Sequence, residues 1–570
     1  MEVTAQATFA STLVDEWARA GVRHAVLAPG SRSTPLALAL ADDDRLSLHV
    51  HLDERSAGYL ALGLALAGGT PAVVLTSSGT AAVELHPAVV EAAQARVPML
   101  VCTADRPFEL KDVGAPQTID QTHLFGRAVR WFAEPGPADE AGAGTWRSFA
   151  SRAVAEAVGP PAGPVHLNLA FRDPLVGRPG PLPAGRPDGR PWHATATPSA
   201  VAPEADDDAV AAGLLEAARG VIVAGRGAEG RWVAPLAEAF GWPVLADPRS
   251  SCRVPDDRTV AYADALLRDP AFAAAHRPGA VLRIGEPPAS KVVAQWLASA
   301  GVSQVVLDPD GAWPDPDRTA GLLLRGRPEV WCRRLAAAPR RPADPAWLAS
   351  WAEAGAAADR ALEAVLAGHP EVTEPAVARR LVAALPDGAT LVCSSSMPVR
   401  DVEWYAAPRP GLTVLANRGA NGIDGVVSTA VGVATGTGGP TALLIGDLAF
   451  LHDANGLLGL AGLDVDLTIV VVDNRGGGIF SFLPQATELP PDRFEQLFGT
   501  PQEVDLTGLA AAHGLAVLEA HDMEGLDVAL RASLSTSGTQ VVLVRTERAA
   551  NVAVHAALHA AVAAALTAAR

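Results

Sequence analysis

Residues 441–480 read TALLIGDLAFLHDANGLLGLAGLDVDLTIVVVDNRGGGIF, and this stretch decides the fold. Two aliphatic runs, residues 441–445 and 467–472, have the length of buried strands, and a helical pattern lies between them. Strand, helix and second strand form the unit of a parallel sheet that helices cover on both faces. Ligands bind such sheets beyond the carboxyl ends of the strands, so the residues after each run are the first candidates for a site.

The same alternation runs through the whole chain. Strand-like runs include residues 24–30, 71–79 and 98–105, then 220–227, 280–287 and 303–309, and finally 390–396 and 539–547. Two stretches rich in Pro, Gly and Arg, residues 177–208 and 333–347, are predicted to be linkers. The sequence therefore predicts an α/β protein of three doubly wound parallel-sheet domains, spanning residues 1–180, 205–335 and 350–570.

Composition limits the partners and the compartment. Among 570 residues, 49% are hydrophobic and 19% charged, and 45 basic against 63 acidic residues give a net charge of −18. Nucleic acid and anionic lipid are therefore unexpected partners, and small molecules are expected. No secretory signal or membrane span is expected, because His555 and His559 interrupt an alanine-rich tail that is only weakly apolar. A reducing cytoplasm is predicted from four scattered cysteines without a Cys-x-x-Cys pair, Cys102, Cys252, Cys332 and Cys393.

Polar residues stand directly after both runs of residues 441–480. Asp447 follows the first run, and Asn474 comes 27 residues later, just before glycines 476–478. Carboxylate and carboxamide oxygens suit octahedral Mg²⁺, which completes its shell with water and phosphate oxygens. Backbone N–H groups at the glycines and at the helix start are expected to face the phosphates. The alternative is a helix cap at Asp447 followed by an ordinary glycine turn; the two features at this spacing favour the metal site.

This arrangement resembles the magnesium and diphosphate motif of thiamine diphosphate enzymes. Six further segments resemble one family among them, the 2-succinyl-5-enolpyruvyl-6-hydroxy-3-cyclohexene-1-carboxylate (SEPHCHC) synthases of menaquinone biosynthesis. They are APGSRSTPLALAL (28–40), HLDERSAGYLALGLALA (51–67), TSSGTAAVELHPAVVEA (76–92), TADRP (103–107), NRGANGIDGVVSTAVGVA (417–434) and DNRGGGIFSFLPQ (473–485).

The resemblance implies a transferase that decarboxylates 2-oxoglutarate and adds the resulting unit to isochorismate. It implies thiamine diphosphate with Mg²⁺, or Mn²⁺, as cofactors. It also implies a pyrimidine-binding, a central Rossmann-like and a diphosphate-binding domain in chain order. The active site is expected between two subunits, in a homodimer or homotetramer.

The resemblance also assigns residues. Glu54 is expected to bind the aminopyrimidine ring and activate the cofactor; alternatively, it is an acidic residue of a helix N-terminus. Glu54, Arg32, Gln117 and Ser396 form the predicted catalytic set. The remaining cofactor contacts are predicted at Ser395, Ser396, Met397, Ile423, Gly446, Asp447, Leu448, Asn474, Gly476, Gly477, Gly478 and Ile479, with Asp447, Asn474 and Gly476 as metal ligands. The resemblance places substrate contacts at Ser31, Arg32, Arg106, Gln117, Lys291, Arg400, Arg418, Ile479 and Phe480, and the cations among them suit carboxylates.

Two positions depart from the family pattern, and three other functions compete with it. Pro116 and Ser395 stand where the family usually has asparagine, so each lacks a carboxamide donor. Residues 225–230, GRGAEG, with Asp247 after the next strand, match a dinucleotide fingerprint and would indicate an NAD-dependent oxidoreductase. The others are an acetohydroxyacid-synthase-like carboligase or 2-oxo acid decarboxylase, and a non-catalytic binding protein.

Overall fold

The computed structural model describes residues 2–194 and 205–568, and in that part of the chain it contains three six-stranded sheets. The strand orders are β2-β1-β3-β4-β6-β5, β12-β11-β10-β7-β8-β9 and β14-β13-β15-β16-β18-β17, and the strands of each ladder run parallel. In each sheet the order reverses beside the first strand, which places a topological switch point at β1/β3, β7/β10 and β13/β15. The predicted fold class is confirmed.

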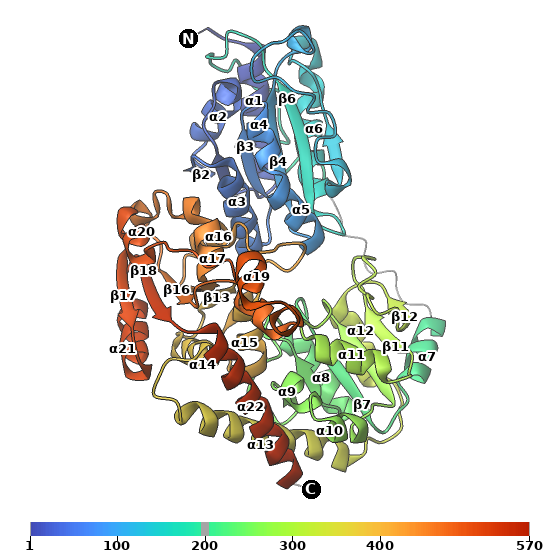
Figure 1. Cartoon of the computed structure of the whole chain (residues 1–570). Helices are drawn as coiled ribbons and strands as arrows, with labels where there is room; N and C mark the ends of the chain where they lie inside the picture. The colour runs from blue at the N-terminus through green and yellow to red at the C-terminus, as the bar shows by residue number, and fades with distance from the viewer. Residues whose placement is uncertain (1, 195–204, 569–570) are drawn as a thin grey trace.

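The N-terminal domain lies above the other two in Figure 1. Its strands are β1 (His24–Leu27), β2 (Ser47–Val50), β3 (Ala72–Thr76), β4 (Met99–Asp105), β5 (Trp131–Ala133) and β6 (Pro164–Ala170). Its helices are α1 (Ala5–Arg19), α2 (Thr34–Ala41), α3 (Glu54–Gly68), α4 (Thr80–Glu84), α5 (His86–Ala95) and α6 (Trp146–Val158).

The middle domain carries the second sheet. Its strands are β7 (Gly220–Ala224), β8 (Val244–Ala246), β9 (Thr259–Val260), β10 (Ala280–Ile284), β11 (Gln304–Leu307) and β12 (Ala320–Leu324). Its helices are α7 (Ala205–Leu214), α8 (Gly230–Phe240), α9 (Ala263–Leu267), α10 (Pro270–Ala275), α11 (Lys291–Ser299) and α12 (Pro328–Ala337), and α13 (Pro345–Ala367) leads to the C-terminal domain.

The C-terminal domain carries the third sheet. Its strands are β13 (Thr390–Cys393), β14 (Thr413–Leu415), β15 (Thr441–Gly446), β16 (Leu467–Asp473), β17 (Ala516–Ala520) and β18 (Thr539–Arg545). Its helices are α14 (Glu374–Ala384), α15 (Met397–Tyr405), α16 (Val426–Thr437), α17 (Asp447–His452), α18 (Gln485–Glu488), α19 (Pro491–Phe494), α20 (Leu506–Ala512), α21 (Met523–Leu534) and α22 (Arg548–Ala568).

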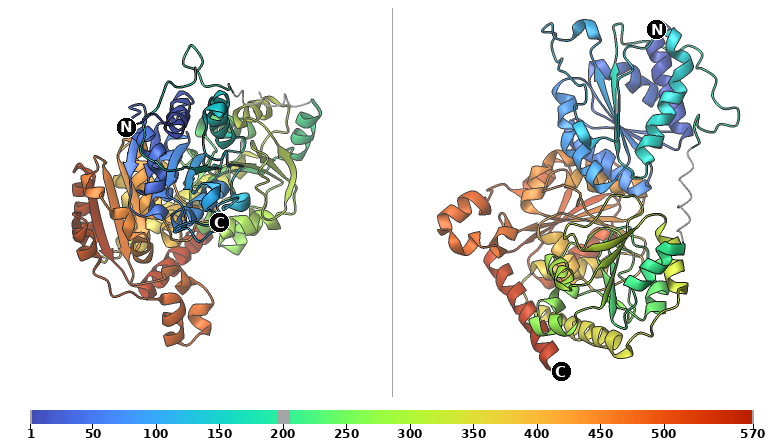
Figure 2. Two further views of the ribbon diagram at one scale, coloured as in Figure 1. Left: turned by 90° about the horizontal axis from the view of Figure 1, so that it is seen from above. Right: turned by 90° about the vertical axis from the view of Figure 1, so that its right-hand side faces the viewer.

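The N-terminal and C-terminal domains pack through α3 and α16, and the right view of Figure 2 shows the first domain seated on the other two. Glycines stand at the helix crossing. A Cβ atom at Gly63 would lie 2.1 Å from the Thr429 carbonyl oxygen, and one at Gly432 would lie 2.2 Å from the Leu60 carbonyl oxygen. The close backbone contact excludes larger residues and fixes the start of α3 relative to the third sheet.

Both predicted linkers are more structured than expected. In the first, the Gly180 N–H donates to Thr8 Oγ1 of α1 (2.9 Å), and residues 205–208 belong to α7; residues 195–204 lie outside the described residues. The second was predicted wrongly at both ends, because Arg333 belongs to α12 and Trp347 to α13. The apolar side chains of these helices pack into the middle domain, which the local Pro and Arg content did not indicate.

Helix α22 is the one described helix that is long and apolar enough to cross a membrane, with a mean hydropathy of 1.6. Its side chains at four-residue spacing, Val554, Leu558, Val562 and Leu566, are instead buried in a cluster that α13 also joins. A core helix passes the same hydropathy test, so this helix is weak evidence for a membrane span.

Candidate active site

The crevice at the β13/β15 switch point contains a cavity of about 460 Å³, within the usual range for small-molecule sites. The connections after β13 and β15 lead toward opposite edges of the sheet, to β14 and to β16, and such a divergence opens a crevice between the two strand ends. The predicted residues that line it are Ser395, Ser396, Met397, Arg400, Arg418, Ile423, Gly446, Asp447, Leu448, Asn474, Gly476, Gly477, Gly478, Ile479 and Phe480.

Asp447 and Asn474 present oxygen atoms to this cavity. The Asp447 carboxylate accepts a 2.7 Å hydrogen bond from the Gly476 N–H, and burial raises the pKa of Asp447 to about 6. Asn474 donates its amide N–H to Glu374 (2.9 Å), which leaves its buried Oδ1 without a hydrogen-bond partner among the described residues. Hard oxygens in these positions fit a Mg²⁺ ion whose other ligands come from diphosphate and water. The described residues contain no cluster of three His, Cys, Asp or Glu that could hold a metal unaided.

The turn after β16 requires glycine. A Cβ atom at Gly476 would lie 2.1 Å from the Gly499 carbonyl oxygen, and one at Gly477 would lie 2.3 Å from the Phe498 carbonyl oxygen. The expectation that these glycine N–H groups face phosphates is wrong. The Gly476 N–H bonds to Asp447, the Gly477 N–H to Gly499 (2.8 Å) and the Gly478 N–H to Gly476 (2.9 Å). All three N–H groups are therefore used in hydrogen bonds within the protein. The turn can offer the cavity its carbonyl groups but not these N–H groups.

Two arginines make the other side of the cavity electropositive. Arg400 donates to the carbonyl of Ser396, a residue held at a left-handed φ of 70° before α15. Arg418 has no hydrogen bond or ion pair with another described residue. Burial lowers the pKa of Arg418, and the nearby cations Arg249 and Arg400 lower it further. An unpaired, half-buried guanidinium here is suited to bind a carboxylate ligand.

Two buried carboxyl groups in the cavity wall were missed by the sequence analysis. Glu374 opens α14 and Asp401 lies on α15, and both line the cavity. Burial and then the neighbouring Asp401 raise the pKa of Glu374, and burial raises the pKa of Asp401. Neither follows a strand end. Glu374 precedes an apolar segment, whereas Asp401 stands between Arg400 and Glu403, so the sequence contains no distinct signal for it.

A second group of predicted residues gathers at the β1/β3 switch point of the N-terminal domain. Arg106 donates to Ser78 Oγ (2.7 Å), and Gln117 donates to the Ser78 carbonyl (3.0 Å). Arg32, on the loop after β1, is buried and donates to the Phe171 carbonyl (2.9 Å), next to exposed Ser31. None of these residues lines the cavity of the C-terminal domain.

Glu54 is the first residue of α3, whose N-cap Asp53 accepts from the Ser56 N–H (3.0 Å). The start of α3 contacts the end of α17, because Arg55 donates to the His452 carbonyl (2.8 Å). Glu54 therefore also fits the helix N-terminus alternative, and it does not line the cavity of its own chain.

Lys291 opens α11 and is exposed, outside the cavity lining. The preceding Ser290 N–H donates to Glu403 Oε1 (2.9 Å), which places this end of the middle domain against α15. Of the predicted substrate residues, Lys291 alone belongs to the middle domain.

Comparison with known proteins identifies the family. Family models match three segments: thiamine pyrophosphate enzyme, N-terminal TPP binding domain (residues 7–124), middle domain of thiamine pyrophosphate (187–393), and C-terminal TPP binding domain (400–544). The SEPHCHC synthase of Chloroflexus aurantiacus is 44% identical and covers 94% of this chain and 92% of its own length. The chain belongs to the SEPHCHC synthase family. Synthases of the same name from Myxococcus xanthus and Halobacterium salinarum are 43% and 42% identical, and cover 96% and 95% of this chain and 95% and 96% of their own.

A member of the SEPHCHC synthase family is a thiamine diphosphate-dependent transferase of menaquinone biosynthesis, and the described architecture agrees with that class. The two departures from the family pattern have local contacts. The Pro116 carbonyl accepts from Arg106 (3.2 Å), and Ser395 Oγ donates to the Asn417 carbonyl (3.2 Å). The domain boundaries drawn from the sequence remain predictions.

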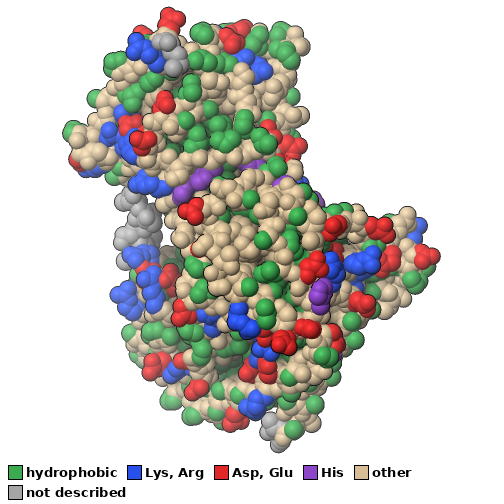
Figure 3. All heavy atoms as spheres, turned by 90° about the vertical axis from the view of Figure 1, so that its left-hand side faces the viewer, with side chains coloured by type: hydrophobic (Ala, Val, Ile, Leu, Met, Phe, Trp, Pro, Cys, Tyr) green, Lys and Arg blue, Asp and Glu red, His purple; other side chains and the backbone are tan. Residues whose placement is uncertain are grey.

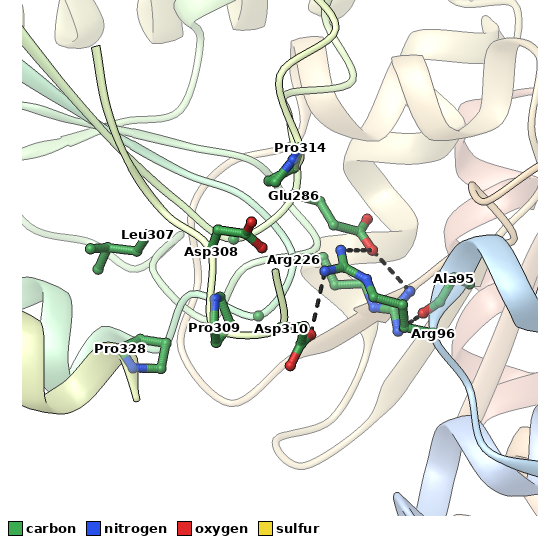
Figure 4. Close-up of a pocket in the computed structure, with 12 residues that line it drawn as sticks. Ala95, Arg96, Arg226, Glu286, Leu307, Asp308, Pro309, Asp310, Pro314 and Pro328 are labelled. Carbon is green, nitrogen blue, oxygen red and sulfur yellow. Dashed lines mark hydrogen bonds and ion pairs between the residues drawn. The ribbon is translucent and has the colours of Figure 1, made fainter. Parts of the chain in front are cut away.

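The dinucleotide fingerprint of the middle domain is occupied by protein contacts (Figure 4). A Cβ atom at Gly225 would lie 1.8 Å from the Glu286 carbonyl oxygen, so the two loops at the β7/β10 switch point touch. Arg226 binds the Ala95 carbonyl (3.1 Å) and Glu286 (3.3 Å), and Asp247 pairs with Arg249 at 3.0 Å. The cavity beside them is about 170 Å³, small for a dinucleotide. The oxidoreductase alternative therefore has no open phosphate site here.

Proposed function

We propose that the enzyme decarboxylates 2-oxoglutarate and adds the succinyl-semialdehyde unit to isochorismate in a 1,4-addition, giving SEPHCHC and CO₂. The observation that carries this proposal is one cavity that combines the oxygens of Asp447 and Asn474 with the unpaired Arg418. The first two groups fit a metal and diphosphate. Arg418 fits a substrate carboxylate, and Arg400 in the same lining offers a second cation, which suits a substrate with more than one carboxylate.

Asp447, Asn474 and the Gly476 carbonyl would hold Mg²⁺ or Mn²⁺ against the diphosphate of the cofactor. Bound thiamine diphosphate would supply a nucleophilic carbon for the keto group of the 2-oxo acid and would accept the electron pair of the carbon–carbon bond that breaks when CO₂ departs. Ser395, Ser396, Met397, Ile423, Leu448 and Ile479 would enclose it, and Glu54 would hold a proton at the aminopyrimidine ring.

The several carboxylates of the two substrates need separate cations. We assign Arg400 and Arg418 to one substrate, and Arg32, Arg106 and Lys291 to the other. Ser31 and Gln117 would bind substrate oxygens, and Ile479 and Phe480 would form the apolar wall. In this arrangement Arg32, Gln117 and Ser396 lie next to the reacting atoms and orient them.

We infer that each active site combines the N-terminal domain of one subunit with the C-terminal domain of another, so that a dimer is the smallest assembly. The two groups of site residues do not line one cavity within a chain, which supports this inference. Figure 3 shows hydrophobic side chains gathered on the visible face of the N-terminal domain. Large apolar side chains of that domain are unusually exposed, among them Val50 (62%), Leu52 (70%), Phe108 (73%) and Val113 (67%).

We place the enzyme in the cytoplasm, in keeping with its free and buried cysteines. The experiment that tests the function is incubation of the enzyme, thiamine diphosphate and Mg²⁺ with 2-oxoglutarate and isochorismate, followed by mass spectrometry of the product. SEPHCHC is expected only when both substrates are present. Equal turnover of pyruvate, with isochorismate dispensable, would instead support an acetohydroxyacid-type reaction.

A further inference from the structure

A line of polar side chains leads away from the wall of the cavity. Asp401, which lines the cavity and is 2% exposed, has its Oδ1 3.2 Å from Nε2 of His555 on α22; this is a close polar contact, and neither atom makes a hydrogen bond with a described residue. The Tyr405 hydroxyl lies 2.8 Å from His555 Nδ1 and 3.2 Å from His559 Nε2. His555 and Tyr405 are fully buried, whereas His559 is half-exposed. The line therefore joins the cavity to the surface.

The line is built from two matched helix faces. Asp401 and Tyr405 are four residues apart on α15, and His555 and His559 are four residues apart on α22, so each pair lies on one face. Residues 549–569 contain only four polar side chains, and three of them, Asn551, His555 and His559, follow each other at intervals of four. The rest of this segment is Ala, Val and Leu.

Apolar packing alone would not call for polar groups on this face of α22, although the His555 ring also packs against Trp404 and Phe482. The neighbouring buried residues of α22 are apolar, and burial of polar side chains is costly unless each finds a partner. Asn551 is 4% exposed, and neither atom of its amide has a hydrogen-bond partner among the described residues. Buried polar groups of this kind bind ordered water, which would extend the line by one helical turn. A polar stripe on an otherwise apolar helix is therefore costly unless its members find partners.

The proposed reaction needs a proton. When the bond to CO₂ breaks, its electron pair forms the new carbon–carbon bond to the isochorismate ring. The displaced ring electrons then take up a proton at the carbon next to the carboxylate. Two doubly charged acids thus give a triply charged product and CO₂, and each turnover consumes one proton from solvent. Substrates that fill the cavity also obstruct the direct approach of water.

We propose that His559, Tyr405, His555 and Asp401 form a relay that carries this proton from the surface to the active site; the inference rests on the proposed function. His559 takes a proton from water at one ring nitrogen and passes the proton of Nε2 to the Tyr405 hydroxyl. Tyr405 donates its own proton to His555 Nδ1, and His555 donates the proton of Nε2 to Asp401. Each imidazole and the hydroxyl can both donate and accept, so no isolated charge has to enter the buried segment.

The surrounding groups suit such a transfer. Burial raises the pKa of Asp401 and favours its protonated form, although His555 and the cation of Arg400 oppose this rise. Burial and the cation of Arg268 lower the pKa of His559 to about 3, so this imidazole is neutral at pH 7. Asp264 on α9 is the other charged group near Tyr405.

The test compares Tyr405→Phe with Tyr262→Phe. Tyr262 is also a buried tyrosine of the same apolar cluster; its hydroxyl binds Asp359 and Arg379 and it does not line the cavity, so its variant controls for the loss of a buried hydroxyl. We expect Tyr405→Phe to lower kcat about tenfold and to enlarge the solvent deuterium isotope effect. The affinity for thiamine diphosphate and both KM values should change less than twofold. Tyr262→Phe should leave kcat and the isotope effect unchanged.

A second variant, His559→Gly, opens the half-exposed end of the relay. Its kcat should fall and recover when imidazole is added, whereas the parent enzyme should not respond. Equal kcat and isotope effects in Tyr405→Phe and Tyr262→Phe, without imidazole rescue, would overturn the relay alone. Any 2-oxo acid that the parent decarboxylates can serve, because release of an aldehyde also consumes a proton. A parent inactive with every 2-oxo acid would overturn the relay together with the proposed function.

Discussion

Asp447→Asn should stabilise the ligand-free enzyme and abolish cofactor binding. The variant keeps the size of the side chain and an oxygen for the Gly476 N–H, but it removes the charge that a metal requires. Burial raises the Asp447 pKa from its ordinary value of 3.8 to about 6, and two pKa units correspond to roughly 3 kcal/mol of stability. Because the folded-state pKa is the higher one, this stability is present below about pH 4 and is lost as the pH rises toward 6.

The assay is thermal unfolding at pH 7.5, with EDTA or with thiamine diphosphate and Mg²⁺. In EDTA the parent should have a lower melting temperature than Asp447→Asn. When the ligands are added, the melting temperature of the parent should rise above that of the variant. The affinity of the parent enzyme for the metal should also fall as the pH drops below about 6, because Asp447 is then protonated and the cation binds its carboxylate form. Asp464→Asn removes an exposed charge near β16 and serves as the control. A variant that melts below the parent in EDTA, or binds the ligands as tightly, would refute the reasoning.

Two further variants separate cofactor activation from substrate binding. Glu54→Gln should still bind thiamine diphosphate but exchange the thiazolium proton far more slowly; unchanged deuterium exchange, measured by NMR, would remove Glu54 from the mechanism. Lys291→Ala should raise the KM for isochorismate more than that for 2-oxoglutarate, with a loss of roughly 1.5 to 3 kcal/mol in transition-state binding. Equal changes in the two KM values would contradict the substrate assignment.

The strand ends were predictable because parallel strands are short aliphatic runs whose termini carry polar residues. Asp447 and Asn474 follow β15 and β16 as expected, and both line one cavity. Side chains that meet only through tertiary packing were not predictable. Asp401 and His555 come from helices separated by about 150 residues, and the local sequence of each gives no sign of the other. The histidines of α22 were interpreted as interruptions of an apolar tract, although their four-residue spacing already indicated a stripe.

The glycines show a different limit. Residues 476–478 were interpreted as a flexible backbone offering N–H groups to phosphates, but the structure uses those groups to close the turn. Sequence reveals that glycine is needed, whereas the directions of the Gly476 and Gly477 N–H groups depend on Asp447 and Gly499, which lie in other segments of the chain. The same limit applies at Gly225. The sequence matched it to a dinucleotide-binding motif, but glycine is needed there because the backbone lies close to the Glu286 carbonyl.

We expect Glu54 and Asp447 of one chain to serve different active sites, because Glu54 does not line the cavity that contains Asp447. Within the chain, Asp447 begins α17, and Arg55, the neighbour of Glu54, binds the carbonyl of His452 at the other end of that helix. A mixture of Glu54→Gln and Asp447→Asn subunits tests this arrangement. If each site takes Glu54 from one subunit and Asp447 from the other, a mixed dimer contains one intact site. Random exchange between equal amounts of two inactive dimers should then restore about a quarter of the parent activity; sites formed within single chains would stay inactive in every mixture.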